Sequence, residues 1–369
     1  MTKKVLHVYK TFFPETIGGV EQSIYNMCKG VKRHGIESKV VCVAKTTTGK
    51  EIIDGIEVTK YPYDISISSC PFSSKLFLNF KKEIERADII HYHYPWPFGD
   101  LLSFLVPKNK KQIVTYHSDI VKQKLLKTLY YPLEQRFLSK VDSIIVTSPN
   151  YIEVSKNLKK FRDKAKTLPL SINRGNYPDT NIIKAKEIRK KFGSNFILFI
   201  GQLRYYKGLH LLIEAMKELP NNLVIIGTGK EEAKLKKLCK KHNISNVYFL
   251  GRVSEEEKVN YLYACYCLAL TSHLKSEAFG VSLLEGAAFG KPLLSCKIGT
   301  GSEYVNQHME TGLLVKPTVK EIRDAILYFI NNPKLAEEMG CNAKKRMEKL
   351  FASDIVNYRL SCIYKELLK

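Results

Sequence analysis

The sequence has 369 residues, of which 44% are hydrophobic and 26% are charged. This length favours two domains of about 150 residues each, and the composition excludes an extensively disordered chain. No run of about 18 apolar residues is present, so no transmembrane helix is expected. The first residues also lack the apolar core of a signal peptide. We therefore expect a cytoplasmic protein.

Lysine and arginine number 59 against 36 aspartates and glutamates, a formal net charge of +23. Residues 108–170 alone carry 14 basic and 5 acidic side chains, a local excess of +9. Such an excess indicates nucleic acid, an anionic membrane or a phosphorylated substrate as partner, or a basic surface that only aids solubility.

The nine cysteines are irregularly spaced, which favours reduced thiols over a disulfide framework. Cys265 and Cys267 lack matching ligands elsewhere in the sequence, so no metal site is expected there.

Short β-branched runs alternate with longer amphipathic segments along the chain. In the first half the expected strands are residues 4–9, 38–44, 89–94, 112–116 and 143–147, with a helix over residues 19–33. The pattern then restarts, with expected strands at residues 195–201, 222–227, 247–250, 268–271 and 292–295 and helices at residues 209–218 and 231–241. Strands that alternate with helices predict parallel sheets covered on both faces.

Residues 168–195 lie between the two halves and begin with several Pro, Gly and Asn residues. This composition is typical of a linker, so we expect a domain boundary here. Two α/β domains that face each other would bind ligands near the carboxyl ends of their parallel strands.

The segment SEAFGVSLLEGAAFGKP contains two glutamates, Glu277 and Glu285. We expect Glu277 in the loop after a strand and Glu285 inside the following helix. The expected helix start comprises Gly280, Val281 and Ser282. Backbone N–H groups at a helix start suit a phosphate, and a carboxylate that accepts from two adjacent hydroxyls suits a ribose or a hexose. The alternative is a capping acid followed by an ordinary surface glutamate.

The spacing of these glutamates resembles the E-x7-E motif of family 4 retaining glycosyltransferases, which have the GT-B fold. The resemblance continues in order over nearly the whole chain. Its motifs are ETIGGVEQSIYNM, DIIHYHYPWPFGD, TYHSD, GQLRYYKGLHLLIEA, GTG, FLGRVSEEEKVNYLYAC, SEAFGVSLLEGAAFGKP and ETGLLVKP. It implies two Rossmann-like α/β domains facing a central cleft. We expect an acceptor-binding domain over residues 1–172, a nucleotide-sugar domain over residues 173–351, and a C-terminal helix over residues 352–369 that packs on the first domain.

The motif GQLRYYKG follows an expected strand and opens a helix, which places Arg204 and Lys207 at the expected cleft. Two cations there would neutralise a diphosphate and stabilise it as it leaves; solvated cations at a helix start are the alternative. The sequence departs from the family pattern at one position, because Gln202 stands where the family has an arginine after the glycine. We expect Arg204 to supply that charge.

Gly18 and Gly19 lie between the first strand and the first helix, where glycine permits positive φ and a close backbone approach to a ligand. The resemblance implies that this loop lies near the sugar and the diphosphate, whereas a tight turn without a ligand is the alternative.

His117 follows a strand and looks like the family histidine that contacts the donor sugar; a structural hydrogen bond is the alternative. His91 and His93 share one face of a strand, but no third metal ligand is apparent.

The resemblance implies that Glu285 holds the ribose and that Glu277, with the backbone of Phe279 and Gly280, holds the donor hexose. The other donor-binding positions that we expect are Gly18, Gly19, Gly229, Arg252, Val253, Val281 and Ser282. The catalytic positions that we expect are His117, Arg204, Lys207 and Glu277. Because two cations face the diphosphate, we expect no metal ion and no cofactor apart from the nucleotide diphosphate sugar, which is the donor substrate.

We expect transfer of a hexose to a lipid-linked or polysaccharide acceptor in bacterial surface glycan synthesis. The stretch IGTGSEYVNQHMETG looks closest to bacterial polysaccharide mannosyltransferases, so GDP-mannose is the first choice of donor and a UDP-hexose the second.

For the mechanism, front-side attack fits the lack of an obvious second nucleophile, and Glu277 as a covalent nucleophile is the weaker alternative. A nucleotide-sugar 2-epimerase has the same fold, but the LRYYKG segment and the E-x7-E motif favour transfer. Nucleic acid is not an expected partner, because no stacking platform or recognised motif accompanies the basic residues.

The segment KQKLLK, residues 122–127, places two leucines among three lysines. Such a segment suits the interface of an anionic membrane. We therefore expect peripheral attachment to the inner face of the plasma membrane, with a basic surface that serves solubility as the alternative.

Overall fold

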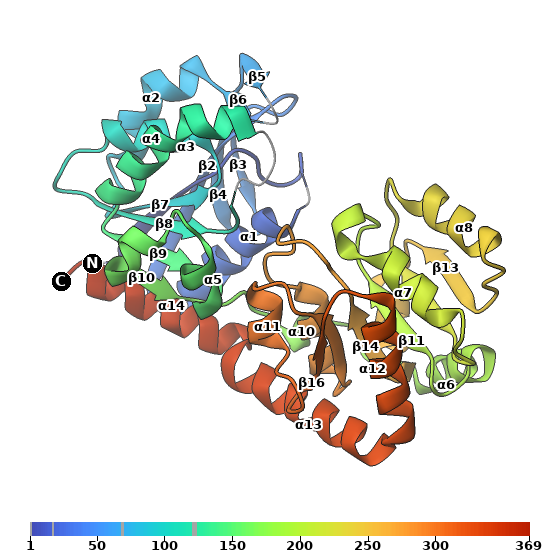
Figure 1. Cartoon of the computed structure of the whole chain (residues 1–369). Coiled ribbons are helices and arrows are strands. Elements are labelled where there is room, and N and C mark those ends of the chain that lie inside the picture. The colour runs from blue at the N-terminus through green and yellow to red at the C-terminus, as the bar shows by residue number, and fades with distance from the viewer. Residues whose placement is uncertain (1, 17, 68–69, 120–123) are drawn as a thin grey trace. The chain divides into compact units, whose positions relative to one another are not determined.

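The computed structural model describes residues 2–16, 18–67, 70–119 and 124–369, and for residues 124–127 the backbone alone. Two compact α/β units make up the chain (Figure 1). The N-terminal unit consists of Met1–Leu170 and Ser353–Lys369, and the C-terminal unit consists of Ser171–Ala352. The chain thus crosses from one unit to the other twice, once after Leu170 and once after Ala352.

An eight-stranded sheet forms the centre of the N-terminal unit, in the order β10-β9-β8-β7-β1-β2-β4-β3. Its strands are β1 (Lys3–Val8), β2 (Ile36–Ala44), β3 (Gly49–Ile53), β4 (Ile56–Pro62), β7 (Ile89–Tyr94), β8 (Lys111–Tyr116), β9 (Ser143–Val146) and β10 (Ala165–Thr167). The strands are parallel except at one edge, where β3 pairs antiparallel with β4. A separate antiparallel hairpin joins β5 (Ile65–Ile67) to β6 (Cys70–Phe72). The expectation of purely parallel sheets was therefore wrong at this edge.

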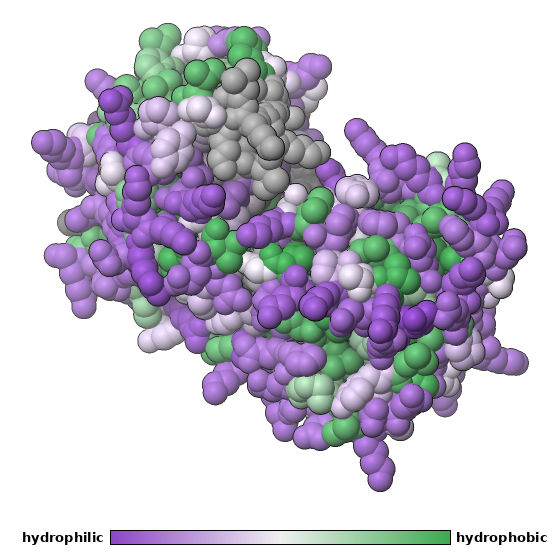
Figure 2. Space-filling model, in the orientation of Figure 1, coloured by the Kyte–Doolittle hydropathy of each residue, from purple (hydrophilic) through white to green (hydrophobic). Residues whose placement is uncertain are grey.

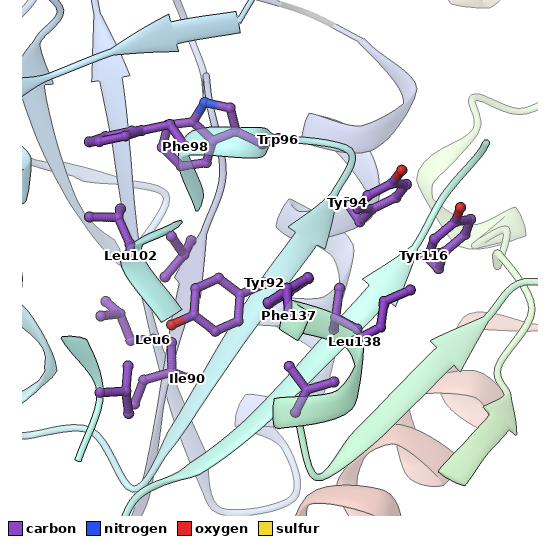
Figure 3. Close-up of a cluster of buried hydrophobic side chains, with 14 of the residues drawn as sticks. Leu6, Ile90, Tyr92, Tyr94, Trp96, Phe98, Leu102, Tyr116, Phe137 and Leu138 are labelled. Atoms are coloured by element: carbon purple, nitrogen blue, oxygen red, sulfur yellow. The ribbon is translucent and has the colours of Figure 1, made fainter. Parts of the chain in front are cut away.

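Helices cover both faces of this sheet. They are α1 (Gly19–Lys32), α2 (Ser74–Ile84), α3 (Pro97–Leu102), α4 (Lys124–Lys140), α5 (Pro149–Val154) and α14 (Ser353–Leu367), with 3-10 turns at η1 (Ser103–Leu105) and η2 (Lys159–Lys164). Successive strand residues point to opposite faces. Leu6 accordingly packs with α2, α3 and α4, in the cluster shown in Figure 3. Val5 packs on the other face with α1 and α14.

The C-terminal unit contains a fully parallel six-stranded sheet in the order β13-β12-β11-β14-β15-β16. Its strands are β11 (Ile197–Ile200), β12 (Leu223–Ile226), β13 (Val247–Gly251), β14 (Cys267–Leu270), β15 (Leu293–Cys296) and β16 (Gly312–Val315). Its helices are α6 (Ile182–Phe192), α7 (Leu209–Met216), α8 (Glu232–Lys241), α9 (Glu255–Ala264), α10 (Val281–Ala288), α11 (Gly301–Val305), α12 (Val319–Asn331) and α13 (Pro333–Leu350), with 3-10 turns at η3 (Arg174–Asn176) and η4 (Tyr205–Lys207). Each expected strand and helix is confirmed, with its ends shifted by at most two residues.

The expected linker over residues 168–195 is only partly a connection. From Ser171 onward the segment belongs to the C-terminal unit, and α6 packs against α9. Ala185 and Phe192 of α6 are buried, so an apolar helix face takes this segment into the core of that unit. The two compact units divide between Leu170 and Ser171, near the start of this segment.

Hydrophilic residues cover most of the face shown in Figure 2, and hydrophobic residues gather on it near α2. Leu78 of α2 is 79% exposed and Leu129 of α4 is 74% exposed. Within the ranges that the structure describes, no helix has both the length and the apolar character needed to cross a membrane.

Candidate active site

Lys207 and Glu277 form an ion pair in the C-terminal unit. Lys207 ends the η4 turn after β11, and Glu277 lies in the loop after β14. The Lys207 ammonium donates to Oε2 of Glu277, and the Ser272 hydroxyl donates to the same oxygen at 3.0 Å. The two charged side chains are only 13% and 9% exposed. Both donors bind Oε2 and so hold the Glu277 carboxylate in place. Its other oxygen, Oε1, has no hydrogen-bond partner among the described contacts.

The η4 turn reaches Glu277 because of Gly208, the residue that follows it. Gly208 has a φ of +68°, and a Cβ there would lie 2.0 Å from the carbonyl oxygen of Thr271. Only glycine fits such a close approach of two backbones. This contact brings the end of η4 beside the end of β14.

Glu285 lies inside α10, as expected, and is held in the same manner by two other residues. The Tyr177 hydroxyl donates to Oε1 of Glu285 at 3.0 Å, and the Lys258 ammonium of α9 donates to the same oxygen at 2.9 Å. The Glu285 and Lys258 side chains are 10% and 14% exposed. Burial lowers the pKa of Lys258, but the carboxylates of Glu285 and Glu255 outweigh it and the pKa is raised. Lys258 therefore stays charged and balances Glu285.

The first turn of α10 begins at a left-handed glycine. Gly280 has a φ of +85°, and a Cβ there would lie 2.8 Å from Cδ2 of Leu270. The first N–H groups of any α-helix lack helical partners, so Val281 and Ser282 can present theirs to an anion. The Phe279 side chain is buried against Phe351.

The other expected donor-binding residues occupy loops that follow strands of the same sheet. Gly229 follows β12, and a Cβ there would lie 2.4 Å from the carbonyl oxygen of Leu203. Arg252 is exposed and Val253 half-buried in the turn between β13 and α9. Arg204 is exposed and donates from Nε to Oε1 of Gln202 at 2.8 Å. Among the described contacts, Arg204 pairs with neither glutamate, unlike Lys207.

In the N-terminal unit, Gly18 and Gly19 stand at the start of α1. Neither glycine uses the positive φ that glycine permits: Gly18 is extended with φ −138°, and Gly19 is not among the described glycines with positive φ. Gly18 instead allows the Glu21 side chain to approach, since a Cβ there would lie 2.5 Å from Oε2 of that residue. Glu21 is held by the hydroxyls of Thr11 and Thr16 at 2.7 and 2.8 Å.

His117 follows β8 and is buried with three further histidines. Its Nε2 lies 3.1 Å from Nδ1 of His93, and Nε2 of His93 lies 2.9 Å from Nδ1 of His7. Burial lowers the pKa of His7 to about 3 and that of His117 to about 4. These rings are therefore neutral at pH 7.

Adjacent strands supply the third histidine that sequence spacing did not show. His7 of β1 pairs in register with His91 of β7, and the ring nitrogens available from His7, His91 and His93 lie within 4.8 Å of one another. The view that His91 and His93 lack a third potential ligand was therefore wrong. Each of these rings already has a hydrogen-bond partner.

Sequence reasoning also missed Ser272, Tyr177 and Lys258. Tyr177 lies 108 residues from Glu285, and Lys258 lies 27 residues from it. No local pattern links positions so far apart, and Lys258 sits in an acidic helix start that reads as an ordinary capped surface helix.

Both halves of the chain match known families. The family described as "Glycosyltransferase Family 4" matches residues 17–174, and the one described as "Glycosyl transferases group 1" matches residues 181–346. The D-rhamnosyltransferase WbpZ of Pseudomonas aeruginosa is 42% identical over 352 residues, which are 95% of this chain and 92% of that protein. The chain belongs to the family 4 glycosyltransferases.

Other comparisons agree with this assignment. The O-antigen chain mannosyltransferase C of Escherichia coli is 39% identical over 353 residues, 95% of each chain. Among solved structures, the sucrose-phosphate synthase of Thermosynechococcus elongatus matches with a TM-score of 0.78 at 19% identity, covering 99% of both chains. Anabaena HepE in complex with UDP and glucose matches with a TM-score of 0.78 at 17% identity, covering 98% of this chain and 99% of that one. These structures show the GT-B fold, and this chain is a glycosyltransferase with that fold.

Proposed function

We propose that this glycosyltransferase is a retaining hexosyltransferase that uses a nucleotide diphosphate sugar. The observation that carries the proposal is the state of the two glutamates of the E-x7-E motif. In each, protein donors hold one carboxylate oxygen, and the other has no partner among the described contacts. A carboxylate fixed on one side and open on the other is preorganised to accept from sugar hydroxyls. In this proposal Glu277 binds the hexose and Glu285 binds the ribose.

Lys207 and Arg204 stabilise the diphosphate as it leaves. Lys207 is held at a fixed position by Glu277, so little reorganisation is needed when negative charge develops beside it. The Arg204 side chain is exposed, and its one hydrogen bond among the described residues is to the neutral Gln202, so it can turn to an anion at little cost. The backbone N–H groups at the start of α10 add to this phosphate site. We propose that these groups make the transfer independent of divalent metal, so that EDTA leaves the rate unchanged.

The configuration at the sugar would be retained by attack from the same face as the departing diphosphate. In this step a hydroxyl oxygen of the acceptor bonds to the anomeric carbon as the carbon–phosphate oxygen bond breaks. The acceptor proton passes to the leaving phosphate oxygen. Glu277 is engaged by Lys207 and Ser272, which suits a positioning role better than that of a covalent nucleophile.

GDP-mannose is the donor that we propose, with a UDP-hexose as the alternative. The support comes from the O-antigen chain mannosyltransferase and the D-rhamnosyltransferase, which this chain resembles over 95% of its length. On the same grounds the proposed acceptor is a lipid-linked or polysaccharide chain in bacterial surface glycan synthesis, bound by the N-terminal unit.

The test is a transfer assay with GDP-mannose and a lipid-linked glycan acceptor, read by NMR of the product. We expect a new glycosidic bond with the anomeric configuration of the donor, in the presence of EDTA. An inverted linkage would contradict the mechanism. Conversion of the donor to its 2-epimer without acceptor would make the chain an epimerase instead.

Docking on an anionic membrane is a second part of the proposal. Leu129 of α4, two residues after the basic segment 122–127 in the sequence, is 74% exposed. Of that segment, Lys122 lies outside the described residues, as do the side chains of Lys124 and Lys127. Each basic residue near an anionic surface contributes about 1 kcal/mol.

Sedimentation with vesicles tests the docking. Binding should require anionic lipid and weaken between low and physiological salt. Replacing Lys122, Lys124 and Lys127 by Glu should abolish it and leave transfer to a soluble acceptor analogue intact. If the unmodified chain ignores anionic vesicles at low salt, the charge serves only solubility.

A further inference from the structure

Four buried histidines follow one another across the sheet of the N-terminal unit. In the register of the sheet His7 of β1 is opposite His91 of β7, and His93 is opposite Thr115 of β8. Residues two apart on a strand share a face, so His117, two residues beyond Thr115, continues the same row. The amino-terminal half of this face is the apolar cluster beneath α1 and α14. A polar row thus extends from that core toward the carboxyl ends of the strands.

Three of the rings form one hydrogen-bonded chain. His7 Nδ1 lies 2.9 Å from His93 Nε2, and His93 Nδ1 lies 3.1 Å from His117 Nε2. His7, His93 and His117 are 0%, 1% and 7% exposed. A neutral imidazole has one donor and one acceptor nitrogen. The proton position on any one ring therefore fixes it on the other two.

Only two arrangements satisfy both hydrogen bonds. In the first, all three rings carry the proton on Nδ1, and His7 donates to His93, which donates to His117. In the second, all three carry it on Nε2, and the donation runs the other way. The two arrangements differ at the ends of the chain, where His7 presents Nε2 and His117 presents Nδ1.

The buried end decides between them. Nε2 of His7 is buried and has no hydrogen-bond partner among the residues that the structure describes. The second arrangement would leave an N–H donor there with no acceptor, and orphaned buried donors are rarer than under-satisfied acceptors. The first arrangement leaves only a bare lone pair at that atom. It also makes His117 a hydrogen-bond donor at Nδ1, the nitrogen that has no protein partner among the described contacts.

We propose that His93 and His7 are positioning residues that hold His117 in the neutral Nδ1–H tautomer, so that it donates to a hydroxyl of the transferred sugar. The hydrogen bond at one imidazole nitrogen sets the tautomer that the other nitrogen presents. The recognised group is a hydroxyl acting as acceptor, whereas the opposite tautomer would require a donor. The role of the sugar rests on the proposed function; the tautomer of His117 does not.

His91 stands beside this chain but outside it. Its Nδ1 lies 2.5 Å from the Tyr364 hydroxyl and its Nε2 lies 2.7 Å from the Thr115 hydroxyl. Its ring stacks on His93 with centroids 4.6 Å apart and planes 19° from parallel. Stacked rings do not direct their lone pairs at a common point, which disfavours a metal ion among His7, His91 and His93. His91 is therefore the matched control for the hydrogen-bonded chain.

The experiment is ¹⁵N NMR of the full chain labelled at histidine, without substrate, for the unmodified protein and for His93→Phe, His7→Phe and His91→Phe. We expect the proton of His117 on Nδ1 in the unmodified protein and in His91→Phe. In His93→Phe we expect a mixture of tautomers, because Nε2 of His117 has lost its donor. A smaller shift is expected in His7→Phe, and His7→Asn, whose amide can donate to His93, should restore the original tautomer.

Kinetics give a second reading. His93→Phe should lower kcat by about 10- to 100-fold, as the loss of a residue that orients a reactive one does, and change the donor KM by less than about threefold. His91→Phe should leave kcat unchanged.

A proton on Nε2 of His117 in the unmodified protein, or an unchanged tautomer in His93→Phe, would overturn the proposal. So would one equivalent of bound zinc that is lost in His91→Phe, since the histidines would then be a metal site. If no donor supports transfer but the tautomers behave as expected, the proposed function fails and the histidine chain stands.

Discussion

Replacing Lys207 by Met tests the phosphate site and the ion pair together. Met keeps most of the side-chain volume and removes the charge. The loss of one preorganised charge donor costs about 2–4 kcal/mol of transition-state stabilisation, which is about a 30- to 1,000-fold fall in kcat/KM. The change also leaves Glu277, 9% exposed, without its counter-ion. Breaking a buried pair on one side costs about 3–5 kcal/mol of folding stability.

A double variant separates these two effects. Adding Glu277→Gln to Lys207→Met removes the unpaired charge, so the free energy of unfolding should recover by about half or more while the activity stays low. Lys236→Met is the matched control, because Lys236 pairs with Glu232 on the exposed surface of α8, and exposed pairs contribute about 0–1 kcal/mol. Urea unfolding and steady-state kinetics give the two quantities. A Lys207→Met variant within about threefold of the unmodified kcat/KM would refute the role of this lysine.

Three further predictions concern the glutamates, the buried histidines and the start of α10. Glu285→Gln should mainly raise the donor KM, whereas Glu277→Gln should mainly lower kcat, because the hexose is where the transition state differs from the ground state. Burial lowers the pKa of His7 to about 3 and that of His117 to about 4, so the unfolded chain takes up protons near pH 6.5 and the folded chain does not. Above pH 6.5 the free energy of unfolding should not depend on these histidines. Toward pH 4 it should fall by up to about 1.4 kcal/mol per pH unit for each histidine, which urea unfolding at several pH values will measure. Gly280→Ala should cost about 1–3 kcal/mol of unfolding free energy, because its φ is +85°.

Each of these predictions has a contradicting outcome. The reverse pattern in KM and kcat would mean that the two glutamates have exchanged roles. An unfolding free energy that stays flat between pH 6.5 and 4 would show that the histidines are not buried neutral. Gly19→Ala is the control for Gly280→Ala, since a Cβ at Gly19 would meet nothing within 4 Å, and equal losses from both changes would contradict the strain at Gly280.

The fold was predictable from the sequence wherever strands are buried on both faces. The strand β7 is buried along its whole length, and its continuous β-branched and aromatic run marked its limits. The hairpin of β3 and β4 was missed because β3 is exposed and mixed in polarity. A signal for it was present: Asp54 and Gly55 have φ of +47° and +79°, and an Asp-Gly pair is a strong indicator of a two-residue hairpin turn.

The candidate site was predictable only where one short segment holds it. The E-x7-E segment placed Glu277 in a loop and Glu285 in a helix, and the structure confirms both positions. Ser272 is only five residues from Glu277, but Lys207, Tyr177 and Lys258 come from remote segments that only the folded chain brings to these glutamates. The same holds for His7, which is 86 residues from His93. The two are neighbours because of the register between parallel strands, which no spacing in the sequence reveals.

Binding of the donor to the full chain tests the central claim most directly. Thermal unfolding with GDP-mannose, UDP-glucose, GDP and UDP at equal concentrations would show which nucleotide sugar the folded chain binds. A ligand present at 100 times its dissociation constant stabilises the fold by about 2.7 kcal/mol. We predict this shift for GDP-mannose, and a much smaller one in Glu285→Gln at the same concentration. If no nucleotide sugar shifts the transition, or if Glu285→Gln responds as the unmodified chain does, the E-x7-E glutamates do not bind the donor and the account is contradicted.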